Sequence, residues 1–107
     1  MAARITKKKM PETMYRASRC CRLLGNPTAY LIIRLLGEKR KTPSELAKDL
    51  GISMVAVSTT LRHLRNVDFV RYETKGNKKE YWLKDKKMLD VLDSLEKWVD
   101  TMREKKE

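Results

Sequence analysis

Residues 53–65 read SMVAVSTTLRHLR and have the pattern of a short amphipathic helix with one polar face. Ser53 suits the N-cap, because its hydroxyl can accept hydrogen bonds from the unpaired backbone N–H groups of the first turn. Val57, Leu61 and Leu64 recur at helical spacing and predict a buried stripe. The outward side chains suit the base edges and phosphates of DNA, and the predicted contacts are Ser53, Met54, Val55, Ser58, Thr59 and Arg62. Alone, the pattern also fits an ordinary surface helix.

A second short helix is predicted directly before this one. Residues 42–45, TPSE, place threonine at the cap, proline at the first helical position and glutamate three residues after the cap. Leu46, Ala47 and Leu50 then point inward, and Gly51 opens a tight turn into the next helix. Two short helices joined at a glycine form the helix-turn-helix arrangement, in which the first supports and the second reads DNA.

After residue 65 the apolar pattern changes from a helical period to alternation. Residues 69–74 (FVRYET) and 80–84 (EYWLK) flank the turn-forming stretch 75–79 (KGNKK), which predicts a β-hairpin. A basic hairpin after a helix-turn-helix is a wing, and its lysines would contact the DNA backbone or minor groove. The wing lysines are Lys75, Lys78 and Lys79. A solvated surface loop is the alternative.

Two more helices are predicted at the start of the chain. The first spans residues 11–24 and ends at Gly25. Asn26 and Pro27 cap and begin the second, which is apolar nearly all round and is stopped by Gly37. The fold class is therefore mainly α with a small β-hairpin, a winged helix-turn-helix in the order α-α-α-α-β-β-α.

The last predicted helix, residues 85–103, carries an apolar seam at alternating steps of four and three, the spacing of a short coiled coil. The seam positions are Met88, Leu92, Leu95, Val99 and Met102. This segment is net acidic inside a basic chain, so we expect it to face away from DNA. Packing within one subunit is the alternative, and we predict a homodimer formed by this helix and residues 11–24.

A chain of 107 residues has room for one domain, and we place it at residues 11–103, between a basic flexible arm at 1–10 and a tail at 104–107. The 25 Lys and Arg residues against 14 Asp and Glu give a formal charge of +11, so the expected partner is a polyanion, double-stranded DNA first. No apolar run can span a bilayer and the N-terminus does not resemble a signal peptide. We expect a cytoplasmic protein with no membrane partner.

Signatures of catalysis are missing, since the chain contains no GxGxxG, GxxxxGK or HExxH pattern. We therefore expect no enzyme and no cofactor. The single histidine, His63, cannot build a metal site alone, so a packed side chain or a phosphate contact is the better prediction.

Cys20 and Cys21 stand adjacent, and neighbouring cysteines rarely bond to each other, so no disulfide scaffold is expected. Cys21 shares the spacing of the apolar positions of its helix and is predicted to be structural. Cys20 is flanked by Arg16, Arg19 and Arg22, and positive charge favours the reactive thiolate. The pair is thus a possible thiol switch, with an inert surface thiol as the alternative for Cys20.

Residues 23–83 resemble the ArsR/SmtB family of winged-helix repressors. The resemblance rests on LGNP (24–27), PSELAKDLGIS (43–53), VS…LRHLR (57–65) and the wing FVR…YWL (69–83). It implies a homodimer that binds operator DNA and is released by a small inducer, commonly a metal or an oxidant. The flanking first and last helices resemble the dimerisation helices of the family.

The chain departs from the family at both of its familiar metal sites. Residues 45–50 contain no cysteine, and Asp90 and Asp93 have no histidine nearby. Thr60 stands where the family often has histidine, and Asp68 where it usually has glycine. The fold inference survives these changes, but the small-molecule or redox inducer is left open.

Three classes of function follow. The leading one is a sequence-specific double-stranded DNA-binding transcriptional regulator, a homodimeric repressor of the ArsR type. The second is a weakly specific nucleoid-associated or RNA-binding protein, for which the charge of +11 would suffice. The third is a winged-helix protein-interaction module in which the charge is incidental.

Overall fold

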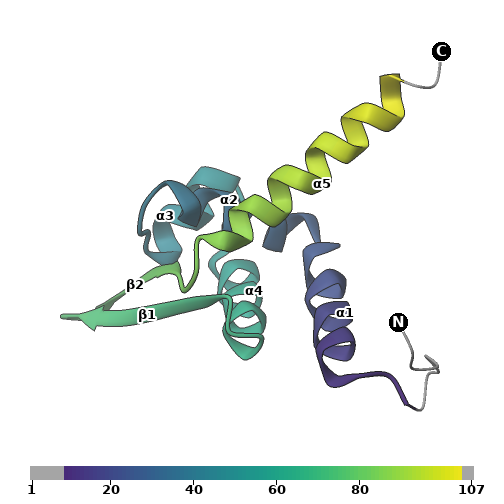
Figure 1. The fold of residues 1–107 in the computed structure, drawn as a ribbon. Coiled ribbons are helices and arrows are strands. Elements are labelled where there is room, and N and C mark those ends of the chain that lie inside the picture. Colours follow the sequence, from purple (N-terminus) through teal and green to yellow (C-terminus); the bar gives the residue numbers. More distant parts are fainter. Residues whose placement is uncertain (1–8, 105–107) are drawn as a thin grey trace.

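The computed structural model of the chain describes residues 9–104, which form five helices and one antiparallel hairpin (Figure 1). The elements are α1 (Glu12–Leu24), α2 (Pro27–Glu38), α3 (Pro43–Leu50), α4 (Met54–Asn66), β1 (Val70–Lys75), β2 (Lys78–Leu83) and α5 (Lys87–Glu104). The predicted order α-α-α-α-β-β-α is confirmed. The predicted basic arm, residues 1–10, lies almost wholly outside the described residues, as does the tail beyond residue 104.

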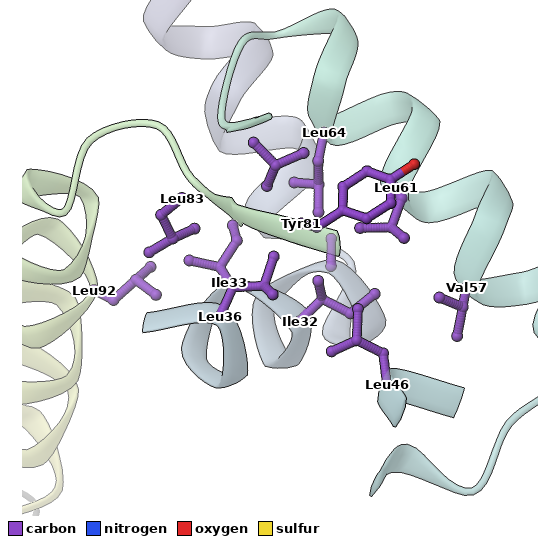
Figure 2. Packing of buried hydrophobic residues seen from close by; sticks show 12 residues of the cluster. Ile32, Ile33, Leu36, Leu46, Val57, Leu61, Leu64, Tyr81, Leu83 and Leu92 are labelled. Carbon is purple, nitrogen blue, oxygen red and sulfur yellow. The ribbon is translucent and has the colours of Figure 1, made fainter. Parts of the chain in front are cut away.

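The core is built around α2, which contacts each of the other helices and strand β2. Its buried side chains meet one stripe of α4, the base of the hairpin and one residue each from α3 and α5 (Figure 2). The core residues are Ala29, Ile32, Ile33, Leu36, Leu46, Val57, Leu61, Leu64, Val70, Tyr81, Leu83 and Leu92. Each fully buried aliphatic side chain contributes about 1.5–3 kcal/mol, so this cluster fixes α4 on the domain.

The helix-turn-helix is held by the predicted caps. Thr42 Oγ1 accepts from the backbone N–H of Glu45 at 3.2 Å, while the Glu45 carboxylate accepts from the Thr42 N–H at 2.8 Å. Gly51 has φ of 67°, the left-handed conformation that glycine adopts at low cost, and turns the chain between α3 and α4. Ser53 Oγ then accepts from the N–H of Ala56 at 3.1 Å and starts α4.

Two predicted helix boundaries are wrong. Gly37 does not stop α2, which continues to Glu38. A Cβ atom at Gly37 would lie 2.7 Å from Cδ2 of Leu89, so the missing side chain admits α5 against α2. Helix α5 begins at Lys87 rather than residue 85, because the Asp85 carboxylate accepts from the Lys87 N–H at 2.9 Å.

Asp68 makes the turn from α4 into the wing with φ of 65°. Its N–H donates to the carbonyl of Arg65 and the N–H of Phe69 donates to the carbonyl of Leu64, each at 2.9 Å. These paired bonds form a Schellman motif, which satisfies the last carbonyls of the helix. Asp68 therefore takes a left-handed backbone conformation and fixes the direction in which the wing leaves α4.

The Asp68 carboxylate accepts from the Lys84 ammonium and also lies 3.5 Å from Nε of Arg71. The Lys84 hydrogen bond is the main cause of the lowered pKa of Asp68. A carboxyl whose pKa is lower in the folded state adds stability above its unfolded pKa, about 3.9, and loses it as pH falls through the folded value.

Asp68→Asn should therefore be less stable than the wild type at pH 7, and the difference should shrink below about pH 4. Asparagine also tolerates the left-handed backbone, so the variant isolates the charge. Urea unfolding at pH 7 and pH 3 measures both values. An equal difference at the two pH values would contradict a role for the ionised carboxylate.

Candidate nucleic-acid interface

The N-terminal ends of α3 and α4 meet the tip of the wing around one open groove of about 300 Å³. The groove is lined by Thr42, Pro43, Ser44, Met54, Asn77, Lys78 and Lys79. Segments distant in sequence are thus brought together, as the helix-turn-helix and wing predictions require. The start of a helix also carries partial positive charge and free N–H groups, which favour an anion such as phosphate.

The outward face of α4 carries Val55, Ser58, Thr59 and Arg62 at steps of three and four. Val55 is 76% exposed, an unusual position for an apolar side chain, and Met54 beside it is 48% exposed. Ser58 and Arg62 are exposed and Thr59 is half-buried. The predicted stripe of Val57, Leu61 and Leu64 lies on the opposite face and is buried in the core. The two faces of α4 are therefore separated as the sequence predicted.

The N-cap residue Ser53 and the helix residue Thr60 have local roles. Ser53 is exposed, but its hydroxyl caps the helix and is engaged with the N–H of Ala56. Thr60 donates its hydroxyl to the carbonyl of Ala56 at 2.9 Å, within the helix. Ser58, Thr59 and Arg62 make none of the side-chain hydrogen bonds or ion pairs found among the described residues.

The three predicted wing lysines differ in their surroundings. Lys75 Nζ lies 3.3 Å from a carboxylate oxygen of Glu80, and Lys79 Nζ lies 4.8 Å from the centre of the Tyr72 ring. Lys78 forms no ion pair within the part of the chain that the structure describes. Lys78 is thus the wing lysine whose ammonium is most available to a phosphate.

Sequence reasoning missed the hydroxyl residues at the start of α3 as members of the site. Thr42 and Ser44 were recognised only as part of a helix-start signal, yet both line the groove beside Met54. Arg65 was also left without a role, and its guanidinium stacks 4.8 Å from the centre of the Tyr72 ring. The available signal was the positive end of a helix in a helix-turn-helix, which suits phosphate contacts.

The predicted dimer seam of α5 divides into two parts. Leu92 is 0% exposed and packs in the core of its own subunit (Figure 2), so its predicted role in dimerisation is wrong. Met88 is half-buried against the same core. Beyond Leu92 the helix projects from the body (Figure 1), and its apolar side chains stay 39–62% exposed. They are Leu95, Trp98, Val99 and Met102.

Polar contacts fix α5 on α2. Glu96 accepts from the Tyr30 hydroxyl at 2.6 Å and from Arg34 Nη2 at 2.7 Å, and Asp93 accepts from Arg34 Nη2 at 2.8 Å. The Tyr30 hydrogen bond, followed by the Arg34 one, lowers the pKa of Glu96. Two acidic residues of α5, Asp93 and Glu96, therefore fix the orientation of this helix on α2.

The predictions for the two thiols are reversed. Cys21 is exposed and Cys20 is half-buried. Burial raises the pKa of Cys20, Cys21 raises it further, and Arg19 opposes the shift with a smaller effect. The argument that arginines make Cys20 a thiolate is thus wrong, and a Cys20 switch has no electrostatic support.

Two further findings concern the described residues. His63 is exposed, so the prediction of a packed histidine is wrong and a phosphate contact stays a prediction. Within residues 9–104, no three His, Cys, Asp or Glu side chains gather as a metal site, and no helix is long and apolar enough to cross a membrane.

A helix-turn-helix followed by a basic wing, with both helix starts and the wing tip around one groove, defines a winged helix-turn-helix DNA-binding protein. Residues 26–72 match the family described as "Bacterial regulatory protein, arsR family". This match covers less than half of the chain, so it shows a similarity to the family over residues 26–72.

Solved structures share the fold. Rv0081 of M. tuberculosis is 22% identical with a TM-score of 0.79, over 91% of this chain and 97% of that one. The transcriptional regulator HlyU of Vibrio vulnificus CMCP6 is 26% identical with a TM-score of 0.68, over 82% and 95%. The homodimeric winged helix-turn-helix DNA-binding domain of Mb0332 from Mycobacterium bovis is 18% identical with a TM-score of 0.77, over 97% and 94%. No curated protein matches the chain in sequence.

Proposed function

We propose that this protein is a transcriptional regulator of the arsR type, a cytoplasmic, homodimeric repressor that binds a specific double-stranded operator. The observation that carries the proposal is the exposed face of α4, which stands beside a groove shared with the wing tip and the start of α3. Such a helix fits the major groove, while a flanking hairpin reaches the adjacent backbone or minor groove. Repression then follows from occupation of the operator.

The residue types on α4 match the chemistry of base pairs. Arg62 can donate two hydrogen bonds to a guanine, and Val55 can pack on the methyl group of a thymine. Ser58 and Thr59 are short enough to meet base edges or phosphates. Lys78 and Lys79 supply charge that positions the domain without reading sequence.

The exposed apolar part of α5 supports a dimer. Leu95, Val99 and Met102 form a continuous stripe, and α1 buries none of its residues within the subunit. In helix-turn-helix dimers the two reading helices contact successive turns of the duplex, about 34 Å apart, and a dimer of this chain is expected to bind in the same way. The similar Mb0332 domain is described as homodimeric, which favours the same assembly here.

Arg62→Ala should weaken operator binding by about 1–3 kcal/mol and relax the preference at one base pair. Lys78→Ala should instead weaken binding to all duplexes alike and lower the salt slope by about 1. Lys75→Ala is the matched control, and its effect should be smaller because Lys75 is already paired with Glu80. Fluorescence anisotropy across a salt series separates the three variants.

Equal, sequence-independent losses for Arg62→Ala and Lys78→Ala would show that α4 touches only phosphates. That outcome would favour the weakly specific nucleic-acid-binding class. Unchanged binding in both variants would remove α4 and the wing from the interface altogether.

A further inference from the structure

Lys41 joins the wing to the helix-turn-helix. Its N–H donates to the carbonyl of Tyr81 at 3.1 Å, and the Tyr81 N–H donates to the Lys41 carbonyl at 2.8 Å. The segment between α2 and α3 thereby adds a one-residue third strand to β2. The Lys41 side chain then turns inward, and its ammonium donates to the Asp49 carboxylate of α3 at 2.8 Å.

Lys41 is unusual among the basic residues of this chain because it is buried. Within the described residues it is the only charged residue that is buried, with 9% of its surface exposed. A buried ammonium is tolerated only when it is paired, and Asp49 is the partner that pairs it. One residue thus connects the wing, the α2–α3 connection and the supporting helix.

Arg40, the residue before Lys41, contacts the outer face of the same hairpin. Its guanidinium lies 4.1 Å from the centre of the Trp82 ring and donates to Glu73 at 2.8 Å, with Glu80 at 3.9 Å. Glu73 and Glu80 stand directly opposite each other on β1 and β2, a like-charge pair that destabilises a hairpin unless a cation lies between them. Arg40 is that cation, and Lys75 adds a second at Glu80.

A two-stranded hairpin alone is only marginally stable in water, so the direction of this wing depends on what holds its base. The holding residues, named here the wing clamp, are Arg40, Lys41, Asp49, Glu73 and Glu80. Glu73 and Glu80 carry negative charge close to the surface that is proposed to bind DNA, where it would repel the phosphates. Their contacts with Arg40 offset this cost by holding the hairpin in place.

We propose that Arg40 and Lys41 are positioning residues for DNA binding, which hold the wing at a fixed angle to α4 so that Lys78 reaches a phosphate while α4 occupies the major groove. The inference rests on the proposed function. The clamp itself is a property of the folded chain and is testable without DNA.

The decisive variant is Glu73→Gln/Glu80→Gln, because two effects predict opposite signs. Removing two negative charges beside DNA should tighten binding if only long-range charge matters. If the carboxylates hold Arg40 and the wing in place, binding should instead weaken by about threefold to tenfold. This loss is smaller than that expected from removing one charged hydrogen bond to DNA. The affinity is measured on one duplex at fixed salt.

A second arm combines Arg40→Gln with Lys78→Ala. If Arg40 acts through the wing, Lys78→Ala should cost less in the Arg40→Gln background than in the wild type, because the wing is already misplaced. Additive losses, with a salt slope lowered by about 1 for Arg40→Gln alone, would mean that Arg40 contacts phosphate directly and would overturn the proposal.

Hydrogen exchange of the Lys41 and Tyr81 amides separates the clamp from the proposed function. Faster exchange in Lys41→Met and Glu73→Gln/Glu80→Gln, with the α4 amides unchanged, supports the clamp even if no duplex is bound. Unchanged exchange in the hairpin, or tighter DNA binding by Glu73→Gln/Glu80→Gln, would overturn it. Failure of the wild type to bind any duplex would reject the proposed function alone.

Discussion

Leu95→Glu should convert the proposed dimer into monomers. Leu95 is the first residue of the exposed apolar stripe of α5 and is 39% exposed in the single chain, so its substitution leaves the subunit core intact. In a dimer, the new carboxylate would be buried without a partner, at a cost of several kcal/mol. Operator affinity should fall roughly a hundredfold or more, because the two half-sites are no longer bound by one linked molecule.

Sedimentation equilibrium at micromolar concentration measures the change in assembly. Lys97→Glu is the matched control, since it introduces the same carboxylate on the same helix but away from the stripe. The control should remain dimeric. A dimeric Leu95→Glu variant, or a wild type that is already monomeric, would remove the proposed interface.

Leu64→Ala should lower the free energy of unfolding by about 2–5 kcal/mol, because it leaves a cavity in the core. Leu64 is 0% exposed and packs from the inner face of α4. Val55→Ala, on the outer face of the same helix, should change stability by less than about 0.5 kcal/mol.

Urea unfolding and duplex binding, measured on both variants, compare the two faces of one helix. Leu64→Ala should affect stability far more than the binding of the folded protein, and Val55→Ala should do the reverse. Equal destabilisation by the two substitutions would mean that the faces of α4 are wrongly assigned.

Local signals in the sequence were sufficient for most of the fold. Thr42, Glu45 and Ser53 could be assigned as cap residues because capping depends on neighbours three residues apart. The tight turn at Gly51 was equally local. The period of the apolar residues predicted the buried stripe of α4, and the remaining positions of the helix were assigned to its exposed face.

The errors arose where a tertiary contact decides the role of a residue. Gly37 has the appearance of a helix stop, but it is used to admit Leu89 from α5. Leu92 has the spacing of a dimer seam, yet the same spacing serves packing on α2 within one subunit. The predicted burial of Cys20 and Cys21 was the wrong way round. Helix α1 buries none of its residues in the subunit, so the period of its apolar residues does not identify a buried face.

The candidate site was predictable where it lies on one element and not where it joins several. Val55, Ser58 and Arg62 follow from the helical period alone. The pairing of Lys75 with Glu80, which leaves Lys78 as the available wing lysine, depends on strand register. The contact of Arg40 with Glu73 joins residues 33 positions apart, and no local pattern indicates it.

The central claim is that the chain reads a specific operator. The most direct test takes a duplex obtained by repeated selection from random DNA and compares its affinity with that of a scrambled duplex of equal length at physiological salt. The proposed function predicts an affinity ratio of roughly 10³ or more, and a selected site with two related halves about one helical turn apart. Equal affinities for the selected and scrambled duplexes would contradict it.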